Sequence, residues 1–227
     1  MGPLKGLKIL EFSGIGPGPF CGMLLADLGA DVIRLDKSST HGNFNKADIH
    51  NRNKKSITVD LKNPESIQEV KKLISQMDGI FEGFRPGVME RLGLGPKECL
   101  EINNSLVYGR MTGWGQEGPM ANQSGHDINY IALSGVLDSM GREGENPQPP
   151  LNLVGDFGGG GMLLAVGMLG AFIHSQKTGE GQVVDAAMID GSSLLMSMFY
   201  SFKEMGFWTE NKESNLLDGA AHFYDTY

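Results

Sequence analysis

Cysteine is scarce in this sequence of 227 residues, which has only Cys21 and Cys99. Neither has a second cysteine or a histidine nearby at the spacing of metal ligands, so the sequence indicates neither a disulfide framework nor a zinc site. Isolated thiols of this kind are typical of a reducing compartment. We therefore expect a cytoplasmic protein without a bound metal.

Basic residues are also few. The 19 lysines and arginines are outnumbered by 27 aspartates and glutamates, which gives a formal net charge of −8 at pH 7. This acidity argues against a general nucleic-acid binder, although it is compatible with a local basic patch. We expect no nucleic-acid partner.

Long hydrophobic runs are missing. The longest apolar stretch, residues 161–173, is too short and too rich in glycine to favour a membrane span. The first residues lead directly into a predicted strand and lack the basic, apolar and small-residue sections of a signal peptide. We expect no membrane partner.

Several motifs that mark nucleotide-binding, hydrolytic or metal sites are absent. The sequence contains no P-loop, HExxH, GxSxG or CxxC. The segment GIGPGPF (14–20) partly matches the dinucleotide-binding pattern, and Asp36 follows at about the spacing of a ribose-binding acid. Pro19, however, occupies the position of the third glycine. The segment predicts a turn into a helix but no NAD site.

The sequence does contain a regular alternation of short β-branched runs and helical patterns. Strands are predicted at residues 7–12, 31–35, 56–60, 79–83, 105–112 and 183–187. Helices are predicted at residues 19–29, 64–76, 162–176 and 188–202, and residues 124–137 form a loop that enters a helix. Pro19 and Pro64 stand in first helical turns. The alternation predicts an α/β fold, a Rossmann-like domain with a mostly parallel sheet and flanking helices.

Two side chains are candidates for proton transfer. His126 precedes Asp127 at a predicted loop-to-helix boundary, and histidine exchanges protons readily near neutral pH. Asp156 precedes four glycines that remove side-chain bulk and would let a substrate approach its carboxylate. From the residues alone, a structural histidine and a helix N-cap at Asp156 are the simpler explanations.

Six segments, in order, resemble the α-methylacyl-CoA racemase family, part of the wider family III CoA-transferase group. They are residues 11–37, 53–62, 84–96, 125–137, 144–162 and 178–191, of which GHDINY (125–130) and NLVGDFGGGG (152–161) are the most specific. The resemblance implies a large CoA-binding domain at residues 1–187, and a helical linker with the start of a small domain at 188–227. It also implies that relatives extend beyond the position that matches residue 227 and that they form interlocked homodimers.

The resemblance assigns His126 and Asp156 to opposite faces of the substrate α-carbon. One group removes the α-proton to form an enolate, and the other returns a proton to the opposite face. The Asp127 backbone amide is the first choice for stabilising the enolate oxygen. Since a thioester already delocalises the charge, no metal or other cofactor is implied, and CoA is part of the substrate.

The resemblance also implies a set of residues that line the acyl-CoA site. These are Lys37, Val59, Asp60, Leu61, Lys62, Arg91, the additional candidate Arg85, and Gly125, His126, Asp127, Ile128, Asn129 and Tyr130. At Lys37 many relatives have arginine, so charge is kept while planar bidentate contact with phosphate is lost.

Two alternatives stay open. In a family III CoA-transferase, Asp156 would be a nucleophile that forms an acyl anhydride. His126 favours the racemase, because transferases generally lack that histidine. The other alternative is an inactive fragment that binds CoA without turnover.

Overall fold

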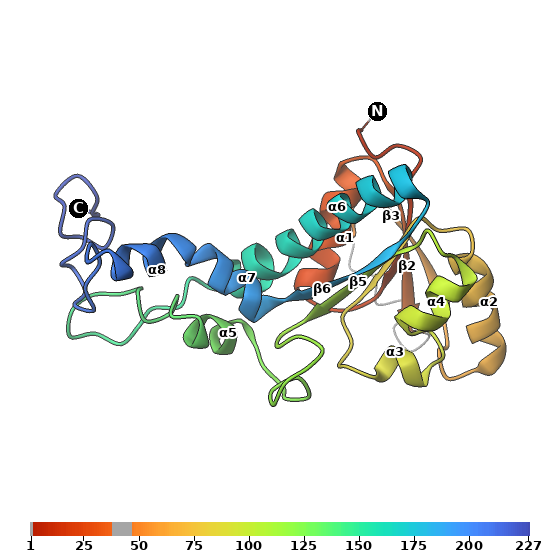
Figure 1. Cartoon of the computed structure of the whole chain (residues 1–227), viewed down its shortest axis with the longest axis horizontal. Helices are drawn as coiled ribbons and strands as arrows, with labels where there is room; N and C mark the ends of the chain where they lie inside the picture. Colours follow the sequence, from red (N-terminus) through yellow and green to blue (C-terminus); the bar gives the residue numbers. More distant parts are fainter. Residues whose placement is uncertain (1, 38–46) are drawn as a thin grey trace.

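The computed structural model of the protein describes residues 2–37 and 47–227 (Figure 1). Within these residues the strands are β1 (Lys8–Phe12), β2 (Asp31–Lys37), β3 (Lys54–Val59), β4 (Gly79–Glu82), β5 (Val107–Thr112) and β6 (Gln182–Ala187). They form one sheet in the order β3-β2-β1-β4-β5-β6, and every neighbouring pair is parallel. The predicted α/β fold is confirmed.

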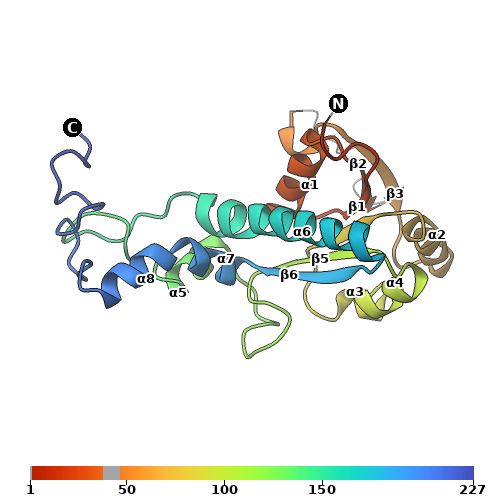
Figure 2. The same cartoon turned by 45° about the horizontal axis from the view of Figure 1, so that its top comes forward.

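Helices cover both faces of this sheet (Figure 2). One face packs against α1 (Pro17–Asp27) and α6 (Leu163–Thr178), and the other against α2 (Pro64–Ile74), α3 (Val88–Arg91) and α4 (Pro96–Ile102). In β1, Ile9 belongs to the first core and Leu10 to the second, and both side chains are fully buried. Strands buried on both faces are apolar at successive positions, which suits a parallel sheet between two helical layers.

The order of the strands reverses at β1, which lies between β2 and β4. In such sheets the loops at the carboxyl ends of the strands beside the reversal border the ligand crevice. Here these loops are residues 13–16, after β1, and residues 83–87, after β4. Gly16 makes the turn into α1 with φ 65 and ψ −116, a conformation that residues with a Cβ rarely adopt.

The glycine-rich segment is helical, which the sequence did not predict. Residues 153–162 form a π-helix, η3 (Leu153–Met162), that continues directly into α6, so Asp156 lies inside a helix and not at an N-cap. By length and composition this continuous segment of 26 residues, Leu153–Thr178, could cross a bilayer. The core helices of soluble proteins can have the same length and composition, and one side of α6 is buried against the sheet.

The last part of the chain leaves the sheet as an arm (Figure 1). The predicted helix at 188–202 is two helices, α7 (Met188–Leu195) and α8 (Ser197–Glu204), because Met196 has ψ −2 and interrupts the helical path. Ile131, Val136 and Met196 form a small separate core, so residues after α5 (Asp127–Leu133) pack with the arm. The arm therefore includes residues from before position 188.

Candidate active site

The first candidate, His126, is placed by the start of α5. It is the N-cap residue of this helix, and its backbone N–H donates to Asn129 Oδ1 at 2.9 Å. This bond satisfies a donor at the helix start, as in a capping box. The His126 side chain itself is exposed.

The second candidate, Asp156, lies half-buried in η3. Asn152, one helical turn earlier, donates from Nδ2 to Asp156 Oδ2 at 3.1 Å. On another side the carboxylate faces the loop between β1 and α1, because a Cβ added at Gly16 would lie 3.3 Å from Asp156 Oδ2. Asp156 therefore lies at the strand reversal, where a parallel sheet places its ligand site.

Asp127 connects the two candidates. Its carboxylate accepts a hydrogen bond at 2.8 Å from the backbone N–H of Asp156, and we call this contact the Asp127 bridge. The side chain is buried, and burial raises the pKa of the Asp127 carboxyl against the lowering effect of the hydrogen bond. Because His126 directly precedes Asp127, the bridge places the backbone of the first candidate beside the helix that contains the second. The sequence predicted a role for the Asp127 backbone but not for its side chain.

The four glycines that follow Asp156 do not open its carboxylate to a substrate, which corrects the prediction. A Cβ at Gly159 would lie 2.7 Å from the backbone nitrogen of Ser192, and one at Gly160 would lie 3.0 Å from Pro17 Cβ. These glycines instead let η3 pack closely between α1 and α7. The glycine that leaves room at the carboxylate is Gly16, which belongs to another cluster.

The other residues of the GHDINY segment divide between core and surface. Tyr130 is buried, its ring packs edge-on against Trp114 with centroids 4.7 Å apart, and burial raises its pKa to about 12. Gly125 leaves room for that ring, since a Cβ there would lie 2.8 Å from Tyr130 Cε1. Ile128 and Asn129 are exposed beside His126. Tyr130 therefore supports the site from within and is not one of its exposed walls.

The first group of predicted CoA-binding residues gathers at the carboxyl ends of β2 and β3. Lys37 and Val59 are partners in the parallel register, and with Leu61 they border a small hollow that also includes Phe12 and Phe84. Asp60 and Lys62 are exposed in the turn after β3, where Asp60 Oδ1 accepts from the Lys62 N–H at 3.0 Å.

The second group follows β4. Arg85 is exposed in the loop at residues 83–87, and Arg91 is exposed at the end of α3. Gly87, with φ 79, lies under the Arg91 guanidinium, because a Cβ there would be 3.1 Å from its Nη1. The predicted cations therefore all lie near the carboxyl edge of the sheet: Lys37 ends β2, Lys62 follows β3, and Arg85 and Arg91 follow β4.

A buried charge network behind these loops was not predicted. Glu82 Oε2 accepts from the Phe84 N–H at 2.7 Å, and Arg110 lies 3.3 Å from Glu82 and 2.9 Å from Glu90. Glu82 therefore holds the loop that contains Arg85, and Arg110 links this loop, through Glu90, to the helix that contains Arg91. Burial raises the pKa of Glu82 to about 7 although Phe84 and Arg110 lower it. The only signal in the sequence was charge at strand positions that should be apolar.

A second buried pair joins Glu11 of β1 to Lys54 of β3, with Oε2 and Nζ 2.6 Å apart. Both side chains are almost completely inaccessible. Burial raises the pKa of Glu11 to about 7 and lowers that of Lys54, while their mutual attraction opposes both shifts. Gly22 provides the space for this pair, because a Cβ there would lie 2.8 Å from Lys54 Nζ.

Three half-buried rings also meet beside Asp156. Phe157 packs against Phe20 of α1 with centroids 4.9 Å apart and against His50 at 5.7 Å. His50 comes from the short helix η2 (Ile49–Asn51). No group of three or more His, Cys, Asp or Glu side chains converges as a metal site among the described residues.

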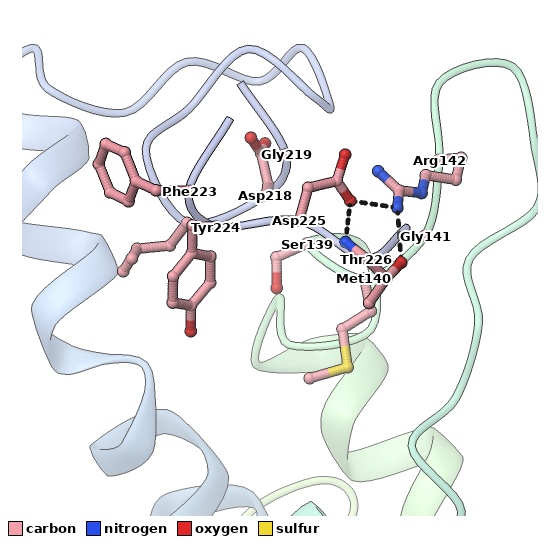
Figure 3. A pocket seen from close by; sticks show the side chains of 11 residues that line it. Ser139, Met140, Gly141, Arg142, Asp218, Gly219, Phe223, Tyr224, Asp225 and Thr226 are labelled. Atoms are coloured by element: carbon pink, nitrogen blue, oxygen red, sulfur yellow. Dashed lines mark hydrogen bonds and ion pairs between the residues drawn. The ribbon is translucent and has the colours of Figure 1, made fainter. Parts of the chain in front are cut away.

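A cavity of about 480 Å³ lies in the arm (Figure 3). Residues 139–142, 217–219 and 223–226 line it, and Arg142 is paired there with Asp225 at 2.5 Å and with Glu213 at 2.9 Å. None of the predicted site residues lines this cavity. The parallel sheet and the Asp127 bridge define a different site.

The chain belongs to CoA-transferase family III, and the match to this family covers residues 4–227. It is similar to the alpha-methylacyl-CoA racemase of Mus musculus, with 45% identity over 99% of the chain. It is also 34% identical, over 96% of its length, to the succinyl-CoA–D-citramalate CoA-transferase of Chloroflexus aurantiacus. The chain spans only 58% and 57% of these two relatives. The family resemblance seen in the sequence is confirmed.

A solved structure shows the same fold. The crystal structure of a CAIB/BAIF family protein from Brucella suis superposes with a TM-score of 0.82 and 30% identity, covering 90% of this chain and 58% of that one. The predicted α/β fold with a mostly parallel sheet is therefore found in a solved CAIB/BAIF family protein.

Proposed function

We propose that the protein containing this chain interconverts the (R) and (S) forms of 2-methylacyl-CoA thioesters. The observation that carries the proposal is the Asp127 bridge, since it holds Asp156, at the strand reversal of the sheet, against the residue that directly follows His126. A racemase needs two such groups, one for each face of the α-carbon. The 45% identity to the mouse racemase supports the same reaction.

The reaction balances as two proton transfers. His126 or Asp156 takes the α-proton, and the electron pair of the broken C–H bond moves into the thioester carbonyl to give an enolate. The other group, which begins protonated, donates its proton to the opposite face and forms the new C–H bond. The two groups exchange protonation states, and solvent resets them before the next turnover.

The enolate oxygen needs a hydrogen-bond donor because neither group is a strong base. We assign this role to the backbone N–H of Asp127, since the first N–H groups of a helix have no acceptor within the helix. A thioester stabilises the enolate well enough that the proposal needs no metal, redox group or other cofactor. The family resemblance supports a homodimer, and the two isolated cysteines support a cytoplasmic location.

The CoA part is assigned to the carboxyl edge of the sheet. Lys37, Lys62, Arg85 and Arg91 are its cations, and charge-assisted bonds to phosphate oxygens are the strongest contacts available to such side chains. Val59 and Leu61 provide the apolar side of an adenine slot, with the Asp60 turn at its rim.

Deuterium incorporation tests the proposal. The complete natural protein would be incubated with one enantiomer of a 2-methylacyl-CoA in deuterated water, followed by chiral analysis and mass spectrometry. We expect loss of stereochemistry together with one α-deuterium. Replacing His126→Gln should abolish inversion, whereas His174→Gln, which changes an exposed histidine on α6, should leave it intact.

The alternative is CoA transfer, which the Chloroflexus relative supports by its name. In that reaction the Asp156 carboxylate attacks the thioester carbonyl, the C–S bond breaks and CoA thiolate leaves an enzyme-bound mixed anhydride. CoA transfer to a free carboxylate, without α-deuterium in the product, would contradict the racemase and favour this reaction.

A further inference from the structure

The side chain of Asp127 occupies an unusual position for an acid at a helix start. Acids there usually face solvent and interact with the helix dipole. Asp127 is only 6% exposed, and its Oδ2 accepts the Asp156 N–H at 2.8 Å. A bond from a buried carboxylate to a backbone N–H is directional, so it fixes the η3 backbone at Asp156 relative to the first turn of α5.

The surroundings leave this carboxylate little freedom. A Cβ at Gly155 would lie 2.6 Å from Asp127 Oδ2 and 3.2 Å from Asp127 Cα, so only glycine fits against the bridge. The second oxygen, Oδ1, is buried without a hydrogen-bond partner. A buried acceptor without a partner destabilises the folded chain, so an apolar side chain would serve packing alone better than this carboxylate.

We propose that Asp127 is a positioning residue whose side chain sets the location of the Asp156 carboxylate relative to His126. This inference rests on the proposed function and deepens it, because it names what holds the two proton-transfer groups in register. Each group has its own local support: Asn129 bonds the His126 backbone at 2.9 Å, and Asn152 bonds the Asp156 carboxylate at 3.1 Å. The Asp127 bridge joins these two halves.

The test measures α-proton exchange and inversion separately, starting from each enantiomer in deuterated water. In Asp127→Ala, the enantiomer deprotonated by His126 should still exchange its α-proton while its inversion falls by about 10- to 100-fold, because Asp156 is misplaced. The enantiomer deprotonated by Asp156 should lose both. Asp127→Asn keeps an oxygen acceptor and should restore a ratio of exchange to inversion near that of the unchanged protein.

Gly155→Ala is a second variant that displaces the bridge while leaving Asp127 in place. It should reproduce the same asymmetry between the enantiomers. If Asp127→Ala and Gly155→Ala, both folded by circular dichroism, lower exchange and inversion equally for both enantiomers, Asp127 has only a structural role and the inference is wrong.

A readout without turnover separates this inference from the proposed function. Hydrogen–deuterium exchange of the Asp156 backbone amide should be faster in Asp127→Ala than in Asp127→Asn or the unchanged protein. If the unchanged protein exchanges no substrate α-proton, the proposed function fails, whereas equal amide exchange in all three proteins overturns the bridge itself.

Discussion

At the scale of single residues, most chemically informative side chains are buried acids held by a specific donor. Asp127 accepts from Asp156, Glu11 pairs with Lys54, and Glu82 accepts from Phe84 and pairs with Arg110. Taking a carboxylate out of water favours its protonated form, and each donor offsets part of that effect. Burial thus raises the pKa of both Glu11 and Glu82 to about 7.

Glu82 predicts a specific pH dependence of stability. Its folded pKa, about 7, lies above the ordinary value of 4.5, so its contribution is fully present below 4.5 and is lost as the pH rises through 7. At 1.36 kcal/mol per pH unit the loss is about 3 kcal/mol at most. Glu82→Gln should flatten the fall in unfolding free energy across this window, measured by urea denaturation.

Glu90→Gln is the matched control, since Glu90 contacts the same Arg110. Burial raises the pKa of Glu90, but hydrogen bonds, including one from Arg110, lower it by more, so the net shift is downward. The contribution of Glu90 to the stability of the folded state is therefore lost as the pH falls. This variant should therefore not flatten the profile between 4.5 and 7. An unchanged slope in Glu82→Gln would show that Glu82 does not titrate there.

At the scale of elements, close helix contacts around η3 place the Asp156 carboxylate. Pro17 of α1 and Met188 of α7 both lie within contact distance of a Cβ added at Gly160. Gly191 of α7 meets η3 directly, because a Cβ there would collide with the carbonyl oxygen of Gly159. The glycines thus determine how near the helices approach.

Gly191→Ala should destabilise the protein by about 1–3 kcal/mol, since the methyl group overpacks a backbone contact that cannot yield by rotating a side chain. Gly170→Ala is the matched control. Gly170 lies on α6 with nothing within 4 Å of an added Cβ, so alanine should stabilise the helix by about 0.5–1 kcal/mol. Thermal denaturation of both variants measures this, and equal effects would contradict the packing argument.

At the scale of the whole molecule, the proposed function requires an acidic chain to bind a polyanion. The formal net charge is −8, yet the proposed CoA cations all lie near the carboxyl edge of the sheet. Local geometry, and not net charge, therefore decides where phosphate binds. The edge proposed to bind CoA is the one at which the strand order reverses.

Lys62→Ala should weaken CoA binding about tenfold, or about 1.4 kcal/mol, and reduce its dependence on salt. Lys55→Ala is the control, because Lys55 lies near the opposite end of β3 and pairs with Asp31 at 2.8 Å. Isothermal titration calorimetry with free CoA at two salt concentrations distinguishes them. Equal affinities of the two variants would remove Lys62 from the CoA site.

The sequence alone predicted the elements and the chemical candidates, because both depend on short-range pattern. The short apolar runs of β1, β4 and β5 predict strands of a parallel sheet. The segments GHDINY and NLVGDFGGGG contain the two proton-transfer candidates. The sequence does not determine the helix bounds, because a proline or glycine indicates a turn but not the side of the turn on which the helix lies.

What only the tertiary structure decided is how residues distant along the chain meet. Residues 153–162 are helical against their intrinsic preference, because packing between α1 and α7 compensates for the flexibility of four glycines. The Asp127 bridge spans 29 positions, and Glu82, Glu90 and Arg110 come from three elements. No periodicity in a sequence records such contacts, since they exist only once the layers have packed.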